Sequence, residues 1–338
     1  MQMEKNKSLQ EYNTFGIDVK AKLFATFNSV TELIDLLSHE NLRSEKHLIL
    51  GGGSNLLFTS NFDGVVLKNE INGIELVKED EEYYYVEAGA GENWHEFVLY
   101  CIEKGWAGLE NLSLIPGCVG ASPMQNIGAY GVEIKDRFEE LQALNISTKE
   151  VETFRSKDCQ FGYRESIFKG TLKNQYIITS VTFRLFKSPQ LNTSYGAIED
   201  MLKEMNVTAP TIKDVSDAVI SIRSSKLPDP AEIGNSGSFF KNPVITNEKF
   251  ELLKSEYPEI VSYPAGPDHR KVAAGWLLDH AGWKGYKEQN YGVHKNQALV
   301  LVNYGGAEGS KIYELSGRIV ESIKSKYGIQ LEREVNIL

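Results

Sequence analysis

The segment Pro116–Gly131, PGCVGASPMQNIGAYG, is the part of the sequence that most limits what this chain can fold into. It holds four glycines and two prolines in sixteen residues and no Asp, Glu, Lys or Arg. Glycine reaches positive φ and lets a ligand approach the backbone, whereas proline fixes φ and has no amide hydrogen to donate. Such a segment favours a loop of fixed shape over a helix or a strand. Because it is uncharged, it differs from a solvated linker, and it indicates a loop that wraps a large, flat or phosphorylated ligand with its amides.

A second glycine loop, Gly51-Gly52-Gly53-Ser54-Asn55, follows the apolar run His47–Leu50. A strand that leads into glycines and small polar residues is typical of loops that bind phosphate through backbone amides. The loop lacks the GxGxxG pattern of dinucleotide-binding folds and the Gly-Lys-Ser/Thr of Walker loops. Taken alone, it is a weak signal and is better explained as a plain tight turn. The two loops together favour a bound cofactor.

Composition excludes several classes of partner. The net charge of −10 disfavours nucleic acid, which would call for a basic face. No apolar run is long enough for a membrane span, and the N-terminus has no apolar signal segment, so we expect a cytoplasmic protein without a membrane partner. Cys101, Cys118 and Cys159 are odd in number and form no CxxC pair, which argues against a disulfide framework.

The sequence also indicates no metal site. Its six histidines include no HxxxH or HxxEH pattern, and each is better explained as a surface or hydrogen-bonded residue. A serine hydrolase is disfavoured because the chain has no GxSxG motif.

The order of the expected elements predicts an α+β chain in three parts. Residues 1–70 hold a helix around Leu33 between strands, residues 71–210 are mostly strands, and residues 211–330 are mostly helical around the strand Ala298–Val302. The expected strand Tyr176–Phe186 alternates, with Ile177 and Val181 on one face. The last strand, 331–338, is expected to return to the first part. Other expected helices are 211–225, 248–255, 271–281 and 310–327.

Six motifs in register resemble the UDP-N-acetylenolpyruvoylglucosamine reductases, flavoenzymes of bacterial peptidoglycan synthesis. Besides the two glycine loops, the resemblance covers nearly the whole chain through YNTFGID, YRESIFK, GNSGSFFKNP, GWLLDHAGWKG, HKNQALVLVN and the terminal Glu334-Val335. The Ser194-Tyr195-Gly196 segment is similar to the type I branch, in which a tyrosine loop covers the substrate.

The resemblance implies an α+β FAD-binding fold of the vanillyl-alcohol-oxidase type. In it, two α+β subdomains (1–70 with the strand 331–338, and 71–210) hold noncovalent FAD, and a separate α+β domain (211–330) binds substrate. The family reduces UDP-N-acetylglucosamine enolpyruvate to UDP-N-acetylmuramate, with NADPH as hydride donor. NADPH and the UDP-sugar share one site in turn, and a monomer is expected.

Three residues match the catalytic positions of the family. Hydride addition to a conjugated carboxylate creates an enolate, which needs a cation or a proton donor. Arg164 suits this because a guanidinium stays charged and binds carboxylates with two parallel bonds, although most arginines form surface ion pairs. Glu334 would help when protonated, and solvent exposure is its alternative. Ser238 resembles the proton donor to C2; without the resemblance it would be a turn serine.

Other matching positions are assigned to cofactor and substrate. Those expected at the cofactor are Gly51, Gly52, Gly53, Ser54, Asn55, Pro116, Gly117, Gly120, Ala121, Gln125, Asn126, Gly128, Ala129, Tyr130 and Gly131. Those expected at the substrate are Tyr195, Arg223, Lys226, Asn242, Lys284 and Gln297, and for Lys284 a solvated side chain is an equal alternative.

The chain departs from the family at Cys118, where Ser or Thr is common, and this thiol could change a flavin hydrogen bond or respond to oxidants. Two alternatives stay open. One is another FAD oxidase or dehydrogenase of the same fold, which would need a covalent flavin His or Cys and a general base. The other is a non-catalytic nucleotide-binding protein. The absence of histidine from both glycine loops disfavours the first, and intact Arg164, Ser238 and Glu334 disfavour the second.

Overall fold

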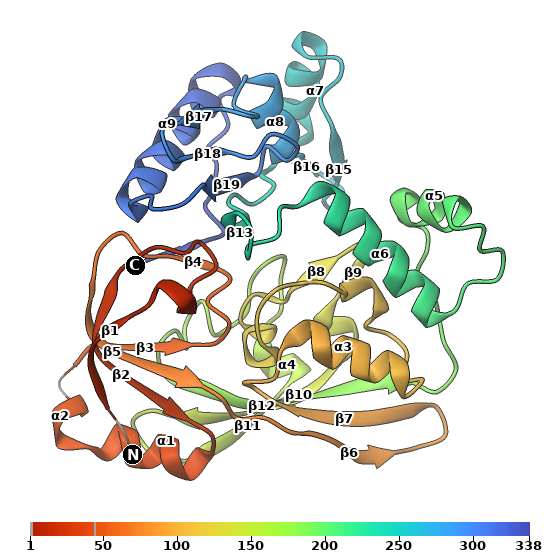
Figure 1. Cartoon of the computed structure of the whole chain (residues 1–338). Helices are drawn as coiled ribbons and strands as arrows, with labels where there is room; N and C mark the ends of the chain where they lie inside the picture. Colours follow the sequence, from red (N-terminus) through yellow and green to blue (C-terminus); the bar gives the residue numbers. More distant parts are fainter. Residues whose placement is uncertain (1–2, 44) are drawn as a thin grey trace. The chain divides into compact units, whose positions relative to one another are not determined.

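The computed structural model describes residues 3–43 and 45–338, and these form two compact units (Figure 1). Unit 1 contains the described parts of Met1–Lys7, Lys22–Gly52 and Asp63–Ser225. Unit 2 contains Ser8–Ala21, Gly53–Phe62 and Lys226–Leu338. Each unit is therefore built from segments far apart in the sequence. The expected boundaries at residues 70 and 210 do not separate these units, and the division into three domains stays a prediction.

Unit 1 begins with a four-stranded sheet in the order β1-β2-β5-β3, in which β3 and β5 are parallel. The helix α1 starts where the Ser29 side chain accepts from the amide of Glu32, an N-cap that leaves Leu33, Leu36 and Leu37 buried. The elements are β1 (Glu4–Ser8), β2 (Lys20–Phe27), α1 (Val30–Ser38), α2 (Glu40–Arg43), β3 (His47–Leu50) and β5 (Phe62–Asn69).

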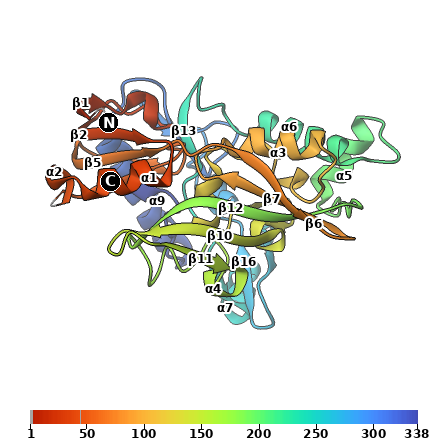
Figure 2. The same cartoon turned by 90° about the horizontal axis from the view of Figure 1, so that it is seen from below.

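A five-stranded antiparallel sheet in the order β11-β10-β12-β7-β6 forms the rest of the unit 1 framework (Figure 2). The helix α3, capped by Asn93, packs on it through Trp94 and Phe97, and the ring of Phe97 lies 5.2 Å from that of Phe183. The elements are β6 (Ile74–Glu79), β7 (Tyr83–Gly89), α3 (Trp94–Glu103), β10 (Phe138–Asn145), β11 (Val151–Arg155) and β12 (Tyr176–Phe186).

The strand β12 has the expected bounds but not the expected alternation. Gln142 pairs with Ser180 and Ala143 with Ile178, so Thr179 is an extra residue opposite β10. Such a bulge changes the face to which the following side chains point. Ile177 consequently packs in the core under α1, whereas Val181 packs in the core under α3. The expectation that both lie on one face was wrong.

Unit 1 also contains short elements between the strands of the five-stranded sheet, and two helices that follow its last strand in the sequence. The helices α5 and α6 share a small core of their own around Ile198 and Val219. The elements are η2 (Glu110–Leu112), η3 (Val119–Ala121), η4 (Pro123–Gln125), β8 (Gly128–Ala129), β9 (Val132–Glu133), η5 (Ile134–Asp136), α4 (Ser156–Cys159), α5 (Gly196–Glu204) and α6 (Ile212–Lys226).

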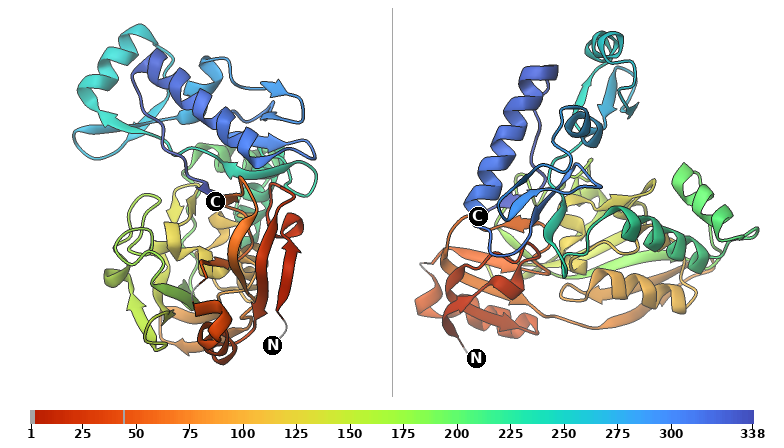
Figure 3. Two further views of the ribbon diagram at one scale, coloured as in Figure 1. Left: turned by 90° about the vertical axis from the view of Figure 1, so that its left-hand side faces the viewer. Right: turned by 45° about the horizontal axis from the view of Figure 1, so that its top comes forward.

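Unit 2 is organised around an antiparallel sheet in the order β13-β19-β18-β17, with the long helix α9 packed on it (Figure 3). A second sheet has the order β14-β16-β15. The elements are η1 (Gln10–Tyr12), β13 (Gly234–Ser238), β14 (Val244–Thr246), α7 (Asn247–Glu256), β15 (Ser262–Pro264), β16 (His269–Val272), α8 (Ala274–His280), β17 (Lys287–Glu288), β18 (Tyr291–Val293), β19 (Val300–Asn303) and α9 (Gly309–Tyr327).

The C-terminus also belongs to unit 2. There β20 (Asn336–Ile337) pairs in parallel with β4 (Leu56–Leu57), so the end of the chain contacts a segment from its first sixty residues. Among the described residues, no helix has the length and apolarity needed to cross a membrane.

Candidate active site

The two glycine loops touch within unit 1. A Cβ on Gly52 would lie 2.9 Å from Cα of Gly117, a distance that real side chains do not reach, and a Cβ on Gly51 would lie 3.5 Å from Cβ of Cys118. The missing side chain of Gly52 is therefore what lets the loops approach. Gly120 is equally close to the end of β7, since its Cβ would lie 2.5 Å from that of Ala90.

Hydrogen bonds fix the large loop on the elements around it. The amide of Gly120 donates to the carbonyl of Ala90 at 3.0 Å, and that of Trp94 donates to Gly117 at 3.0 Å. Gly51 and Gly52 form with the large loop a backbone cradle that has no charged side chain of its own, which fits the long, flat and phosphorylated FAD. Gly53, the next residue, has a left-handed backbone with φ of 63°.

Asn126 supports the loop from within. It is buried, has φ of 43°, and its side-chain amide donates to Glu133 and to the carbonyl of Gly162, each at 3.0 Å. Its side-chain oxygen accepts from the amide of Lys135 at 3.2 Å. These bonds to protein groups hold the shape of the loop, and a contact between Asn126 and the cofactor stays a prediction.

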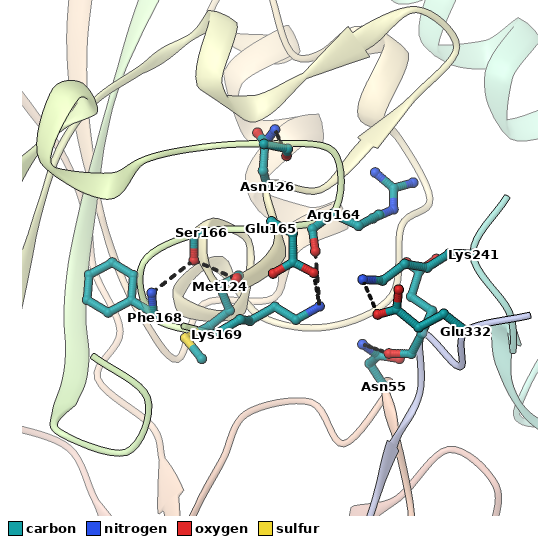
Figure 4. Close-up of polar contacts among 12 residues, drawn as sticks. Asn55, Met124, Asn126, Arg164, Glu165, Ser166, Phe168, Lys169, Lys241 and Glu332 are labelled. Carbon is teal, nitrogen blue, oxygen red and sulfur yellow. Dashed lines mark hydrogen bonds and ion pairs between the residues drawn. The ribbon is translucent and has the colours of Figure 1, made fainter. Parts of the chain in front are cut away.

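Arg164 lies against the same loop (Figure 4). Its guanidinium donates to the carbonyl of Gly128 at 2.7 Å, and its own carbonyl accepts from Nζ of Lys169 at 3.0 Å. Its φ of 55° is in the left-handed region, which residues with a Cβ rarely adopt. Ser166 fixes the neighbouring turn by donating to the carbonyl of Met124 at 2.6 Å.

A second guanidinium stands close to Arg164 in unit 1. Burial lowers the pKa of Arg223, Tyr130 opposes this shift through its charge and a hydrogen bond, and the charge of Arg164 adds to the lowering. Burial raises the pKa of the Tyr130 hydroxyl. Tyr195 completes the group, because its ring meets that of Tyr130 edge-on at 5.5 Å. This cluster of two cations and two tyrosines suits an anionic ligand.

Ser238 and Glu334 lie on two paired segments of unit 2. The amide of Glu334 donates to the carbonyl of Phe239 at 2.8 Å, and Phe240 pairs with Arg333 in an antiparallel bridge. Ser238 therefore precedes, by one residue, the position opposite Glu334 on the neighbouring strand. Ser238 is exposed and Glu334 is partly buried.

Asn55, in the small glycine loop, helps to hold the segment that contains Glu334. The side chain of Asn55 donates to the carbonyl of Glu334 at 3.3 Å, and the carbonyl of Asn55 accepts from the amide of Asn336 at 3.1 Å. On the other side, buried Lys241 pairs with Glu332 at 2.6 Å (Figure 4). Lys241 was not among the residues predicted from the sequence, although its place in FFKNP, between Ser238 and Asn242, was a usable signal.

The four remaining substrate candidates belong to unit 2. The side chain of Asn242 accepts from the amide of Ala274, at the start of α8, at 2.9 Å, and a Cβ on Gly275 would lie 3.6 Å from Oε1 of Gln297. Asn242 and Gln297 thus lie at one end of α8. Lys284 lies beyond its other end, exposed and paired with Asp279 at 2.8 Å. Lys226 is exposed at the last position of α6.

In the parts of the chain that the structure describes, no group of three or more His, Cys, Asp or Glu could hold a metal ion. Cys118 is buried, and burial raises the pKa of its thiol. A raised pKa favours the protonated thiol, which argues against the redox-sensitive behaviour considered for it, and its redox role stays open to test.

Comparison with known proteins gives the family. A model of the FAD binding domain matches residues 21–154, and a model of the C-terminal domain of UDP-N-acetylenolpyruvoylglucosamine reductase matches residues 229–338. The reductases of that name from Flavobacterium johnsoniae and Amoebophilus asiaticus are 52% and 50% identical to this chain, and each match covers 100% of both chains. The chain belongs to the UDP-N-acetylenolpyruvoylglucosamine reductase family. It is accordingly an FAD-dependent oxidoreductase.

Solved structures agree on the fold of this reductase family member. The UDP-N-acetylenolpyruvylglucosamine reductase of Thermus caldophilus superposes with a TM-score of 0.70 at 22% identity, covering 100% of this chain and 99% of that one. The p-cresol methylhydroxylase superposes with a TM-score of 0.52 at 13% identity, covering 98% and 84%. The expected α+β FAD-binding fold of the vanillyl-alcohol-oxidase type is confirmed.

Proposed function

We propose that this protein reduces UDP-N-acetylglucosamine enolpyruvate to UDP-N-acetylmuramate with NADPH, a step of peptidoglycan precursor synthesis. Support comes from the names of relatives that match over the full chain and from the cluster of groups suited to anions. A monomer in the cytoplasm, with NADPH and the UDP-sugar using one site in turn, belongs to the same proposal, since both compounds are metabolites of the cell interior.

FAD bound at the glycine loops would supply a two-electron carrier between NADPH and the enolpyruvyl group. The loops would hold it through the backbone of Gly51–Asn55 and Pro116–Gly131. The contact between Gly52 and Gly117 supports this assignment, because it joins the two segments into one cradle.

Arg164 is proposed to bind the substrate carboxylate and to stabilise the enolate that forms as hydride arrives. Its guanidinium is fixed by the Gly128 carbonyl, so little reorganisation is needed when the charge develops. The left-handed backbone of Arg164 is the kind of local strain that persists where the surrounding structure needs a side chain in one place.

Ser238 is proposed to give its hydroxyl proton to C2 of the enolate, with Glu334 beside it. The observation that carries the proposal is the hydrogen bond from the Glu334 amide to the Phe239 carbonyl, at 2.8 Å, which pairs the segment of Glu334 with the segment that contains Ser238. A protonated Glu334 stabilises the enolate by donating a hydrogen bond. The serine alkoxide left behind regains a proton from solvent, which exposed Ser238 can reach between turnovers.

The diphosphate and sugar are assigned to the remaining candidates. Tyr195, Arg223 and Lys226 would contact the diphosphate, the first two from the cluster around Tyr130. Asn242 and Gln297 would line the pocket at the start of α8. Lys284 is the weakest of the set because its ammonium is already paired with Asp279.

Isotope labelling tests this function. With deuterated NADPH, deuterium should appear at C3 of the product, and in heavy water deuterium should appear at C2. Ser238→Ala should still reduce its flavin but lose on the order of 10²–10⁴ in the second half-reaction, the usual effect of removing a proton donor. Near-normal turnover of that variant would remove the role of Ser238. NADPH oxidation that needs oxygen and ignores the enolpyruvyl substrate would instead identify an oxidase, and colourless protein without extractable flavin would identify a non-catalytic binder.

A further inference from the structure

Leu114 has a strained backbone directly in front of the large glycine loop. Its φ is 58°, in the left-handed region that disfavours a residue with a Cβ. It lies two residues before Pro116 and is partly buried. A strained residue at this point sets the direction in which the chain enters the loop, so the contacts that hold Leu114 bear on the loop's shape.

Both peptide groups of Leu114 are held by side chains from helices. Its amide donates to Nδ1 of His95 at 3.0 Å, and its carbonyl accepts from Nε of Arg223 at 3.1 Å. His95 is in the first turn of α3, and Arg223 is near the end of α6. The amide of Trp94, beside His95, donates to Gly117 in the loop itself at 3.0 Å. The start of α3 therefore holds the loop on both sides of Pro116.

The contact also defines the state of the His95 ring. A backbone amide can only donate, so Nδ1 must accept, and the neutral ring must carry its proton on Nε2. Burial lowers the pKa of His95, and the charge of Arg223 on α6 acts in the same direction, while Glu96 on its own helix opposes them. The ring is therefore the neutral acceptor at neutral pH.

We propose that His95 is a positioning residue for the FAD-binding loop: with Arg223 it holds Leu114 in the left-handed conformation and thereby sets the shape of Pro116–Gly131. Arg223, proposed above to bind the sugar nucleotide, would thus also shape the cofactor site through its bond to the Leu114 carbonyl. This inference rests on the part of the proposed function that locates FAD at this loop.

Acid should weaken the arrangement. Protonation of Nδ1 would turn an N–H toward the N–H of Leu114 and remove the bond. Because the folded pKa lies below the ordinary value of 6.5, the bond is intact above pH 6.5 and is lost as the pH falls through the folded pKa. FAD affinity should fall in the same range.

The test measures the FAD dissociation constant of the full-length apoprotein from the quenching of flavin fluorescence. His95→Ala should raise this constant on the order of 3- to 10-fold, the effect of one lost hydrogen bond. His95→Asn, whose side-chain oxygen can replace Nδ1, should restore affinity and remove the acid dependence. Leu114→Gly in the His95→Ala background should also restore affinity, because glycine needs no support at positive φ. His269→Ala, at an exposed histidine in unit 2, is the control.

Three results would overturn the inference: wild-type affinity in His95→Ala, no recovery on adding Leu114→Gly to it, or unchanged acid dependence in His95→Asn. Thermal melting of each apoprotein identifies variants that fail to fold, and the recovery by Leu114→Gly separates positioning from a general loss of structure. No substrate enters the measurement. If FAD binds as expected but the enolpyruvyl sugar is not reduced, the proposed reaction fails while the role of His95 stands.

Discussion

Arg164 combines a strained backbone, a fixed side chain and a neighbouring cation, Arg223. Two guanidinium groups near one another are unfavourable until an anion joins them, and the diphosphate and the enolate of the proposed reaction would each supply one. At the scale of single residues, this is a physical argument in favour of the roles proposed for Arg164 and Arg223.

Replacing Arg164 should separate the two halves of the reaction. A charge-assisted hydrogen bond contributes about 1.5–3 kcal/mol, so Arg164→Ala should slow reduction of the enolpyruvyl group roughly 10- to 200-fold. Flavin reduction by NADPH should change much less. Stopped-flow absorbance of the flavin measures each step, and Arg164→Lys controls for charge without the planar fork. Slower flavin reduction with an intact second step would contradict the assignment.

The three cysteines should resist alkylation in the native protein. All are buried, and burial raises the pKa of each thiol, that of Cys159 to about 12. Only thiolates react, so native protein at neutral pH should incorporate little iodoacetamide, whereas urea-unfolded protein should incorporate three equivalents. Rapid labelling of Cys118 in the native protein, located by peptide mass, would revive a redox role.

Individual residues could be predicted where a side chain acts by its own chemistry. The roles of Arg164 and Glu334 were argued that way, and both stay predictions. Asn126 was expected at the cofactor, yet its side chain bonds Glu133 and the Gly162 carbonyl. The support that His95 gives to Leu114 was not foreseen, because it depends on a positive φ in a leucine and on a contact nineteen positions away.

At the scale of elements, the periodicity of the sequence predicted where β12 begins and ends. The register with which it pairs with β10 could not be predicted. The strand β12 has the expected bounds, but its bulge depends on register with β10, which no single strand reveals. A helix was expected over 271–281, but α8 begins at Ala274 because the preceding residues pair with β14 and β15. The terminal strand was expected over 331–338, and only Asn336–Ile337 is a strand.

The contact between the two glycine loops gives a matched pair of variants. In Gly52→Ala the new methyl would lie 2.9 Å from Cα of Gly117, so the loops must separate, whereas in Gly51→Ala it would lie at an ordinary 3.5 Å from Cβ of Cys118. Overpacking of this kind costs about 1–3 kcal/mol. Gly52→Ala should therefore bind FAD several-fold to a hundredfold more weakly, and Gly51→Ala should bind nearly normally. Equal flavin content and equal dissociation constants in the two variants would show that this contact does not shape the cofactor site.

At the scale of the whole molecule, the sequence could not show that each of the two units is built from separate segments of the chain. Ser8–Ala21 and Gly53–Phe62 belong to unit 2 although they flank parts of unit 1. Neither segment carries a compositional boundary, because each is a continuous part of the sequence whose partners lie more than two hundred residues away. Asn303, for example, donates to the carbonyl of Phe15 at 2.8 Å. Such contacts are determined by tertiary packing and not by local propensity.

The last two residues should therefore matter more than a chain terminus usually does. The carbonyl of Leu338 accepts from the amide and from the hydroxyl of Thr59, each at 2.7 Å, and the amide of Leu338 donates to Leu57 at 2.9 Å. Deleting residues 337–338 removes these three bonds, which at about 0.5–1.5 kcal/mol each gives a loss of roughly 1.5–4.5 kcal/mol in the free energy of unfolding of unit 2. Urea denaturation followed by tryptophan fluorescence measures this loss.

Thr59→Val is the control for that deletion, because it removes only the hydroxyl bond and should lose about 0.5–1.5 kcal/mol. The deletion should also slow the enolpyruvyl half-reaction more than flavin reduction, since β20 follows Glu334 in the chain and Asn55 bonds both Glu334 and Asn336. An unfolding midpoint equal to that of the full chain would mean that the terminus frays without consequence. In that case the pairing of Glu334 with Phe239 would be sufficient to hold the segment of Glu334. The shortened enzyme should then keep its full rate in both half-reactions.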